Sequence, residues 1–374
     1  MSENPCYGYR QAKPCWREGR GSVIRRYGKN GKAGWKIARA AGKIAVDRLE
    51  PRVLLSSIVV NTTRDDGPFP PSSGLVSLRD AIESAVGSTT ISFDPKVFAI
   101  HQTIKLRDQR LRMSGGFPIA IEGPAEGVTL DAQGQDGDFV IYQGVVSMSH
   151  ISIINCGAPA IYSHGQLTLT DVVLSKSSGD PDGGGLFNDG TATLVNVTIS
   201  NNNAARGGGI ENHGILSLTN VTLSGNSGGA IFNAGTGVIA LTNVTIANNI
   251  APMNGGGISN PWGSVTIANS IIADNSAMSP NANAPDIAGT VHSQGHNVVG
   301  IADGSYGLLK SDFKGTSAAP LDARLSPLGN YGGSMQTIVP LGGSPASGDG
   351  AISLLPADIT TDQRTTRGGF TSDE

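Results

Sequence analysis

The feature that most constrains the fold is a repeat that runs from Gly185 to Asn275. Its second copy reads GIENHGILSLTNVTLSGN and ends at Asn226. Each of the four copies carries an anchor asparagine, and successive anchors are 24, 23 and 26 residues apart: Asn196, Asn220, Asn243 and Asn269. A period of roughly 20–50 residues marks solenoids, propellers and arrays. We therefore expect a chain that grows by stacking similar units.

The pattern within each copy predicts short strands. In the second copy Leu216 and Leu218 precede Asn220, and Val221 and Leu223 follow it, so apolar residues alternate on both sides. Two-residue alternation is typical of β-strands, and strands this short, separated by single turn residues, indicate a tight coil. The chain also holds 52 glycines, which disfavour long helices. We predict an all-β, single-stranded, right-handed parallel β-helix over residues 111–300.

The asparagines are expected to turn the chain and to stack. Asparagine tolerates the left-handed backbone region better than other non-glycine residues, and stacked amides hydrogen-bond along an axis. We predict one ladder of Asn196, Asn220, Asn243 and Asn269 and another of Asn202, Asn226, Asn249 and Asn275. A third set, just after each glycine–apolar strand, is Asn188, Asn212, Asn233 and Asn260. In two less regular coils upstream, Asp171 and His150 take the anchor position.

Charge divides the chain into a basic leader and an acidic body. Residues 1–48 hold 12 Lys/Arg and three acids, whereas the remainder holds 15 and 27. We predict a leader over residues 1–57, an N-terminal cap over 58–110, the β-helix over 111–300 and a C-terminal cap over 301–374. In the first cap, Ser77 to Ala85 is expected to form one short helix, N-capped by Ser77 with Asp80 three residues on.

Two N-terminal segments carry family resemblances. Residues 49–56, LEPRVLLS, resemble the LEPR-x-LL motif of secreted and surface proteins of planctomycetes and related bacteria, which implies export by a family-specific leader. Residues 77–82, SLRDAI, resemble the CSLREA-type region that precedes bacterial β-helices, with Val76 where that motif has its leading cysteine. The second resemblance implies a bacterial β-helix that this segment precedes as a terminal cap.

The repeat and the C-terminal region carry further resemblances. DARLSPL at 322–328, GGSPA at 342–346 and DQR at 362–364 resemble the choice-of-anchor Q region that ends bacterial surface β-helix proteins. GGAI at 228–231 resembles the repeats of chlamydial polymorphic outer-membrane proteins, which are surface adhesins. These resemblances imply a secreted or cell-surface, adhesin-like protein.

Catalysis is the alternative that the sequence leaves open. β-Helices of the pectate-lyase type host polysaccharide lyases and glycosidases, whose chemistry needs carboxylates or a basic residue grouped on one face. The ionisable candidates of the middle coils are Asp180, Asp182, Asp189, Arg206, Glu211 and His213. They occur once each and in no lyase or glycosidase motif, so we expect them in solvated loops and turns. Their convergence in one groove would favour an enzyme.

The sequence therefore favours a non-enzymatic surface protein that serves adhesion, surface structure or glycan binding. The alternative is a polysaccharide lyase or glycoside hydrolase on the same scaffold. No catalytic, cofactor-binding or metal-binding residue is assigned, and no cofactor is expected. The expected partner is a surface polysaccharide or another cell-surface component. A nucleic-acid binder acting through residues 10–48 is a third hypothesis, which we do not favour, and no run of about 18 apolar residues predicts a transmembrane helix.

Overall fold

The computed structural model describes residues 55–65, 73–107, 109–136, 139–179, 181–279, 284–357 and 359–364. The chain divides into two units, Met1–Pro51 and Arg52–Glu374, and only residues of the second are described. The predicted leader and the LEPR-x-LL-like motif therefore lie outside the described residues, apart from residues 55–57.

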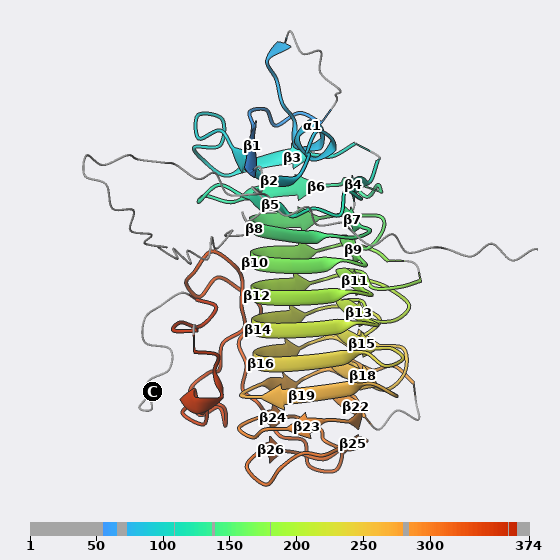
Figure 1. The fold of residues 1–374 in the computed structure, drawn as a ribbon. Coiled ribbons are helices and arrows are strands. Elements are labelled where there is room, and N and C mark those ends of the chain that lie inside the picture. The colour runs from blue at the N-terminus through green and yellow to red at the C-terminus, as the bar shows by residue number, and fades with distance from the viewer. Residues whose placement is uncertain are drawn as a thin grey trace, which may run out of the picture. The chain divides into compact units, whose positions relative to one another are not determined.

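The described chain forms a right-handed parallel β-helix, as predicted (Figure 1). The long sheet follows the order β1 (Leu55–Val60), β2 (Ser88–Phe93), β5 (Ile119–Glu122), β8 (Val145–Ile154), β10 (Gln166–Ser175), β12 (Thr191–Ser200), β14 (Ile215–Ser224), β16 (Val238–Ala247), β20 (Ile271–Ala273), β24 (Val298–Val299) and β26 (Phe313–Lys314). Four more of its strands lie beside that path: β3 (Gln102–Lys105), β6 (Val128–Asp131), β19 (Ser264–Ala268) and β23 (His292–Ser293).

A narrow sheet forms the other side of each coil. It contains β4 (Leu111–Met113), β7 (Phe139–Ile141), β9 (Ile161–Ser163), β11 (Leu186–Asn188), β13 (Ile210–Asn212), β15 (Ile231–Asn233), β18 (Ile258–Asn260), β22 (Ile287–Thr290) and β25 (Ser305–Tyr306). A third, two-stranded sheet pairs β17 (Ile250–Ala251) with β21 (Ser276–Ala277). Among the described residues, no helix is both long and apolar enough to cross a membrane.

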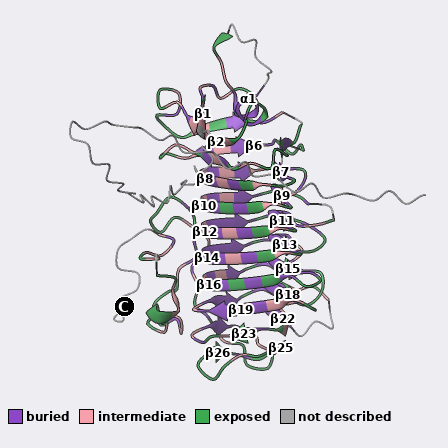
Figure 2. Ribbon diagram, in the orientation of Figure 1, coloured by how far each residue is buried: buried purple, intermediate pink, exposed green. Residues whose placement is uncertain are grey.

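The predicted alternation places the core between the two sheets. Equivalent residues of successive coils pair in parallel, so that Leu194 lies beside Leu218 and Leu241 follows in the next coil. The four inward positions predicted for the second repeat, Leu216, Leu218, Val221 and Leu223, are at most 1% exposed. Figure 2 shows buried and exposed residues alternating along the first half of β10 and of β16. Burying apolar side chains is the main stabilising contribution of the stacked coils.

The anchor position bends the strand without ending it. Asn196, Asn220, Asn243 and Asn269 have φ between 48° and 59°, and the two predicted substitutes, Asp171 and His150, have 55° and 56°. The left-handed conformation predicted for them is therefore confirmed. The prediction that they separate two short strands is wrong for the middle coils: β12, β14 and β16 are ten-residue strands in which pairing omits the asparagine and resumes after it.

The second asparagine set stacks as predicted but does not turn the chain. Its positive-φ residue is the one before, as in Asn201, Gly225 and Asn248. The asparagines themselves lie inside, where Asn202 Nδ2 donates to Asn226 Oδ1 at 3.1 Å and Asn226 Nδ2 donates to Asn249 Oδ1 at 2.9 Å. A residue that points inward has its amide free to bridge coils, while the preceding residue makes the bend.

This interior ladder ends on a buried carboxylate, Asp286. Asn249 donates to Asn275 Oδ1 at 2.9 Å, and Asn275 donates through Nδ2 and its backbone N–H to Asp286 Oδ1. The third set also forms a ladder: Asn188 donates to Asn212, Asn212 to Asn233 and Asn233 to Asn260, at 2.7–2.9 Å.

The carboxyl at the end of the ladder makes stability depend on pH. Burial raises the pKa of Asp286 from 3.8 to about 6, and the N–H groups that it accepts from Asn275 and Ile301 oppose the shift. The folded state thus binds this proton more tightly than the unfolded state. The protonated carboxyl therefore contributes fully to the free energy of unfolding below about pH 4, and this contribution is lost as the pH rises through 6. The expected loss is about 3 kcal/mol. Urea unfolding of Asp286→Asn between pH 4 and 7 should show a correspondingly flatter pH dependence.

Glu126→Gln, at an exposed carboxyl, is the matched control and should keep the wild-type slope. An Asp286→Asn profile parallel to the wild type would refute a role for this carboxyl.

The predicted helix closes the first coil. It is α1 (Leu78–Glu83), and Ser77 and Asp80 form the predicted capping box, with Asp80 N–H donating to Ser77 Oγ at 3.1 Å and Ser77 N–H donating to Asp80 Oδ2 at 3.0 Å. The apolar face is buried, and so is Arg79. Its guanidinium donates to both carboxylate oxygens of Asp65, at 2.9 and 2.7 Å. This buried ion pair joins the helix to the chain that precedes it.

Candidate functional site

The outward residues of the narrow sheet form a row across successive coils. Each three-residue strand buries its first and last side chains, so its central residue faces outward. In-register pairing then aligns Tyr162 of β9, Phe187 of β11, Glu211 of β13 and Phe232 of β15. The Tyr162 and Phe187 rings stack at 4.4 Å with an interplanar angle of 3°. Glu211 occupies the next place in this row, between two aromatic residues.

Charged side chains surround Glu211. Arg206 precedes β13 and its Nη2 lies 3.2 Å from Asp182 Oδ1 and 3.8 Å from Glu211 Oε1. The Arg206 guanidinium also lies 5.1 Å from the centre of the Phe232 ring, a cation–π distance. His213 contacts Glu211 Oε1 through Nε2 at 2.9 Å. We call Asp182, Arg206, Glu211 and His213 the Glu211 cluster.

Glu211 is the buried centre of this cluster. Its side chain is 1% exposed, whereas those of Arg206, His213 and Asp182 are 54%, 38% and 33% exposed. Burial raises the pKa of Glu211, while the hydrogen bond from His213 and the charge of Arg206 oppose that rise. Its Oε2 atom has no hydrogen-bond partner among the described residues. Glu211 thus orients two exposed cationic or polar side chains and keeps one acceptor unused.

The structure brings together most of the ionisable candidates of the sequence. Asp182, Arg206, Glu211 and His213 converge, and Asp189 contacts His164 Nδ1 at 2.9 Å on the adjoining coil. The expectation of solvated loops and turns agrees with the exposure of Arg206, His213 and Asp182, but it is wrong for Glu211, which is buried in β13. Asp180 lies outside the described residues.

The repeat period is the reason for this convergence. Asp182 and Arg206 are 24 residues apart, as are Phe187 and Glu211, so each pair occupies the same position in neighbouring coils. The sequence reasoning missed Tyr162, Phe187, Phe232 and His164. The 24-residue spacing could have revealed Phe187, because it aligns that residue with Glu211. Among the described residues, no group of three or more His, Cys, Asp or Glu side chains is placed to hold a metal ion.

Comparison with known proteins gives a likeness of fold. No family model matches the chain, and no curated protein matches it. Among solved structures, it is similar to a crystal structure of the pectate lyase Pel9A, with 14% sequence identity and a TM-score of 0.45. The similarity covers 66% of this chain and 70% of that one.

Proposed function

We propose that this chain is an exported bacterial β-helix protein that binds a polysaccharide at the Glu211 cluster without cleaving it. The observation that carries the proposal is the convergence of three exposed polar side chains around one buried carboxyl. Sugar hydroxyls both donate and accept hydrogen bonds, so a mixed set of guanidinium, imidazole and carboxylate groups suits them. The half-buried rings of Tyr162 and Phe232 supply apolar contact beside those groups.

Location at the cell surface is part of the same proposal. It is supported by the resemblances of residues 49–56, 77–82 and 322–364 to segments of secreted and surface β-helix proteins. The body after residue 48 has a formal charge of −12, which disfavours nucleic acid as its partner.

A glycan array of the full chain tests this proposal. The glycan that binds most tightly should then be titrated against Arg206→Ala and His213→Ala, each of which removes an exposed donor. A hydrogen bond to a charged group contributes about 1.5–3 kcal/mol, so the affinity should fall roughly tenfold or more. Lys105→Ala and His292→Ala, at exposed sites on the long sheet, are the matched controls and should bind like the wild type. Equal affinity of all five proteins would refute this site.

A polysaccharide lyase or glycoside hydrolase is the second candidate. Two observations favour it: the ionisable side chains of the Glu211 cluster converge, and burial raises the pKa of Glu211, as a general acid requires. Its 1% exposure disfavours it, because a general acid must come within hydrogen-bond reach of the substrate. The polysaccharides bound on the array should therefore be incubated with the chain and assayed for new reducing ends and unsaturated uronates. Cleavage that Glu211→Gln abolishes would establish the enzyme and overturn the binding proposal.

A further inference from the structure

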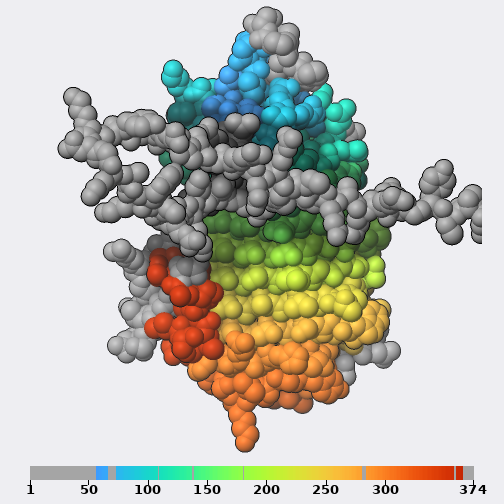
Figure 3. Space-filling model, viewed as in Figure 1, coloured from blue at the N-terminus to red at the C-terminus, as the bar shows by residue number. Residues whose placement is uncertain are grey.

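The C-terminal residues lie along the outer face of the long sheet and are held there at two places. Figure 1 shows this segment beside the coils, and Figure 3 shows it as a layer against them. At the first place, the Gln363 carboxamide donates to Thr198 Oγ1 at 2.8 Å and accepts from Thr222 Oγ1 at 2.7 Å. Asn220 Nδ2 donates to the carbonyl of Thr361 at 2.9 Å. We call this contact the Gln363 clamp.

The second place lies on a later coil. Asn269 Nδ2 donates to the carbonyl of Ala351 at 2.8 Å, and Asn269 Oδ1 accepts the N–H of Ala351 at 3.0 Å. His296 Nδ1 contacts the carbonyl of Asp349 at 2.6 Å. We call this contact the Ala351 clamp. Both clamps place an amide group of the C-terminal segment against the anchor asparagines.

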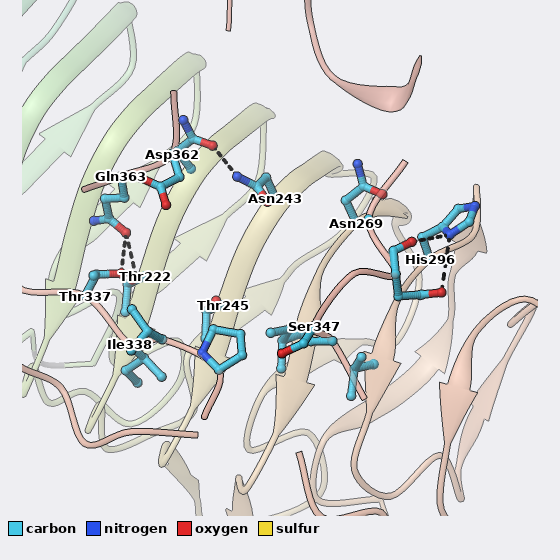
Figure 4. Close-up of a pocket in the computed structure, with 18 of the residues that line it drawn as sticks. Thr222, Asn243, Thr245, Asn269, His296, Thr337, Ile338, Ser347, Asp362 and Gln363 are labelled. Atoms are coloured by element: carbon cyan, nitrogen blue, oxygen red, sulfur yellow. Dashed lines mark hydrogen bonds and ion pairs between the residues drawn. The ribbon is translucent and has the colours of Figure 1, made fainter. Parts of the chain in front are cut away.

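Between the clamps, the described part of the C-terminal segment forms no hydrogen bond with the anchor position of β16. Asn243 Nδ2 donates only to Asn220 Oδ1, and Thr245 Oγ1 has no hydrogen-bond partner among the described residues. This position lies in a groove between the segment and the sheet, which has a volume of about 880 Å³ and extends over both clamps, from Asn220 to His296 (Figure 4). Asn243 and Thr245 line one side and Ile338, Pro340 and Ser347 line the other. A volume of this size is typical of small-molecule sites.

The chemistry of the two clamps indicates what the groove can hold. On neighbouring coils Asn220 Nδ2 donates to a backbone carbonyl, and Thr198 Oγ1 accepts an N–H of the Gln363 carboxamide. The equivalent groups on β16, the Asn243 amide and the Thr245 hydroxyl, suit the same two partners. The ionisable side chains of the lining pair with each other at its ends: Asp362 with Arg364, and His296 with Asp349. The middle of the groove is thus neutral, with amide and hydroxyl groups on one side and apolar carbons on the other.

We propose that this groove binds a neutral ligand that carries an acetamido group, the class that includes N-acetylated amino sugars. The ligand carbonyl accepts from Asn243 Nδ2, its N–H donates to Thr245 Oγ1, and its methyl group packs against Ile338 and Pro340. The clamps close both ends along the stack of coils, which suits a compact sugar unit rather than a long chain. This site lies on the long sheet and is independent of the Glu211 cluster on the narrow sheet.

Calorimetric titration of the full chain with N-acetylglucosamine and its β-linked dimer tests the proposal, with glucose and glucosamine as ligands that lack the acetamido group. Thr245→Val removes one hydroxyl at nearly constant volume and should weaken binding about five- to tenfold. Ser347→Trp fills the groove from the exposed segment and should abolish binding. Thr193→Val, on β12 of the same sheet and away from the groove, is the matched control and should bind like the wild type.

Three results would each overturn the proposal: no heat of binding at millimolar N-acetylglucosamine, equal binding of glucose, or unchanged affinity in both Thr245→Val and Ser347→Trp. Thermal unfolding of each variant checks that a loss of binding does not come from a loss of fold. Because Arg206→Ala leaves the groove intact, it should bind the acetamido ligands normally whatever happens at the Glu211 cluster.

Discussion

Asn202→Ala is expected to lower the free energy of unfolding by roughly 3–5 kcal/mol. Asn202 is 1% exposed and bridges three coils. Its Oδ1 accepts the backbone N–H of Ser177 at 2.9 Å, and its Nδ2 donates to the carbonyl of Leu174 at 3.0 Å and to Asn226 Oδ1 at 3.1 Å. Alanine would leave the Ser177 N–H and the Leu174 carbonyl buried without these partners. An unsatisfied buried backbone group costs about 1–3 kcal/mol, so the losses accumulate.

The next residue provides the matched control for this experiment. Asn203 is exposed, its side chain makes no hydrogen bond to the described residues, and its backbone pairs with Ser178 and Ser227 of the neighbouring coils. Asn203→Ala should change the unfolding free energy by less than about 0.5 kcal/mol. Denaturation in urea, followed by circular dichroism, measures both variants. Similar losses in the two would show that the interior ladder does not stabilise the fold.

Arg79→Met is expected to destabilise the N-terminal cap by roughly 3–5 kcal/mol. The Arg79 and Asp65 side chains are each 3% exposed, and Arg79 also donates to the backbone carbonyls of Gln109 and Arg110. Methionine keeps much of the side-chain volume but leaves the Asp65 carboxylate buried without its cation. The cost arises from that uncompensated charge more than from the lost attraction.

Amide hydrogen exchange can show which elements lose stability in Arg79→Met. In Arg79→Met, faster exchange should begin at α1 and β1 and extend to β2, while β14 and β16 keep their protection. Arg112→Met, at an exposed arginine of β4, should leave both regions unchanged. If the wild type and Arg79→Met exchange alike around α1, the ion pair has no part in holding the cap.

The sequence predicts the coils far better than it predicts the surface. Local signals suffice for Asn196, Leu218 and Ser77, because backbone conformation, strand alternation and helix capping each depend on residues a few positions apart. The burial of Arg79 and the role of Gln363 escape such reasoning, because Asp65 and Thr198 are their partners from distant segments. The Glu211 cluster lies between these cases. Residues 24 positions apart occupy the same place in neighbouring coils, so the cluster can be predicted from the sequence once the coils have been aligned.

The interior ladder also has a consequence for how such a chain can lengthen. From Asn202 to Asn275 every amide donates toward the following coil, and the last one meets Asp286, which when ionised only accepts. A gene duplication that copied one whole coil inside this stretch would give the new asparagine an acceptor on one side and a donor on the other. The two ends would remain as they are. A coil added beyond Asp286 would instead place its asparagine next to a carboxylate, which cannot donate a hydrogen bond to it. We therefore expect duplicated coils only in the middle of the stack.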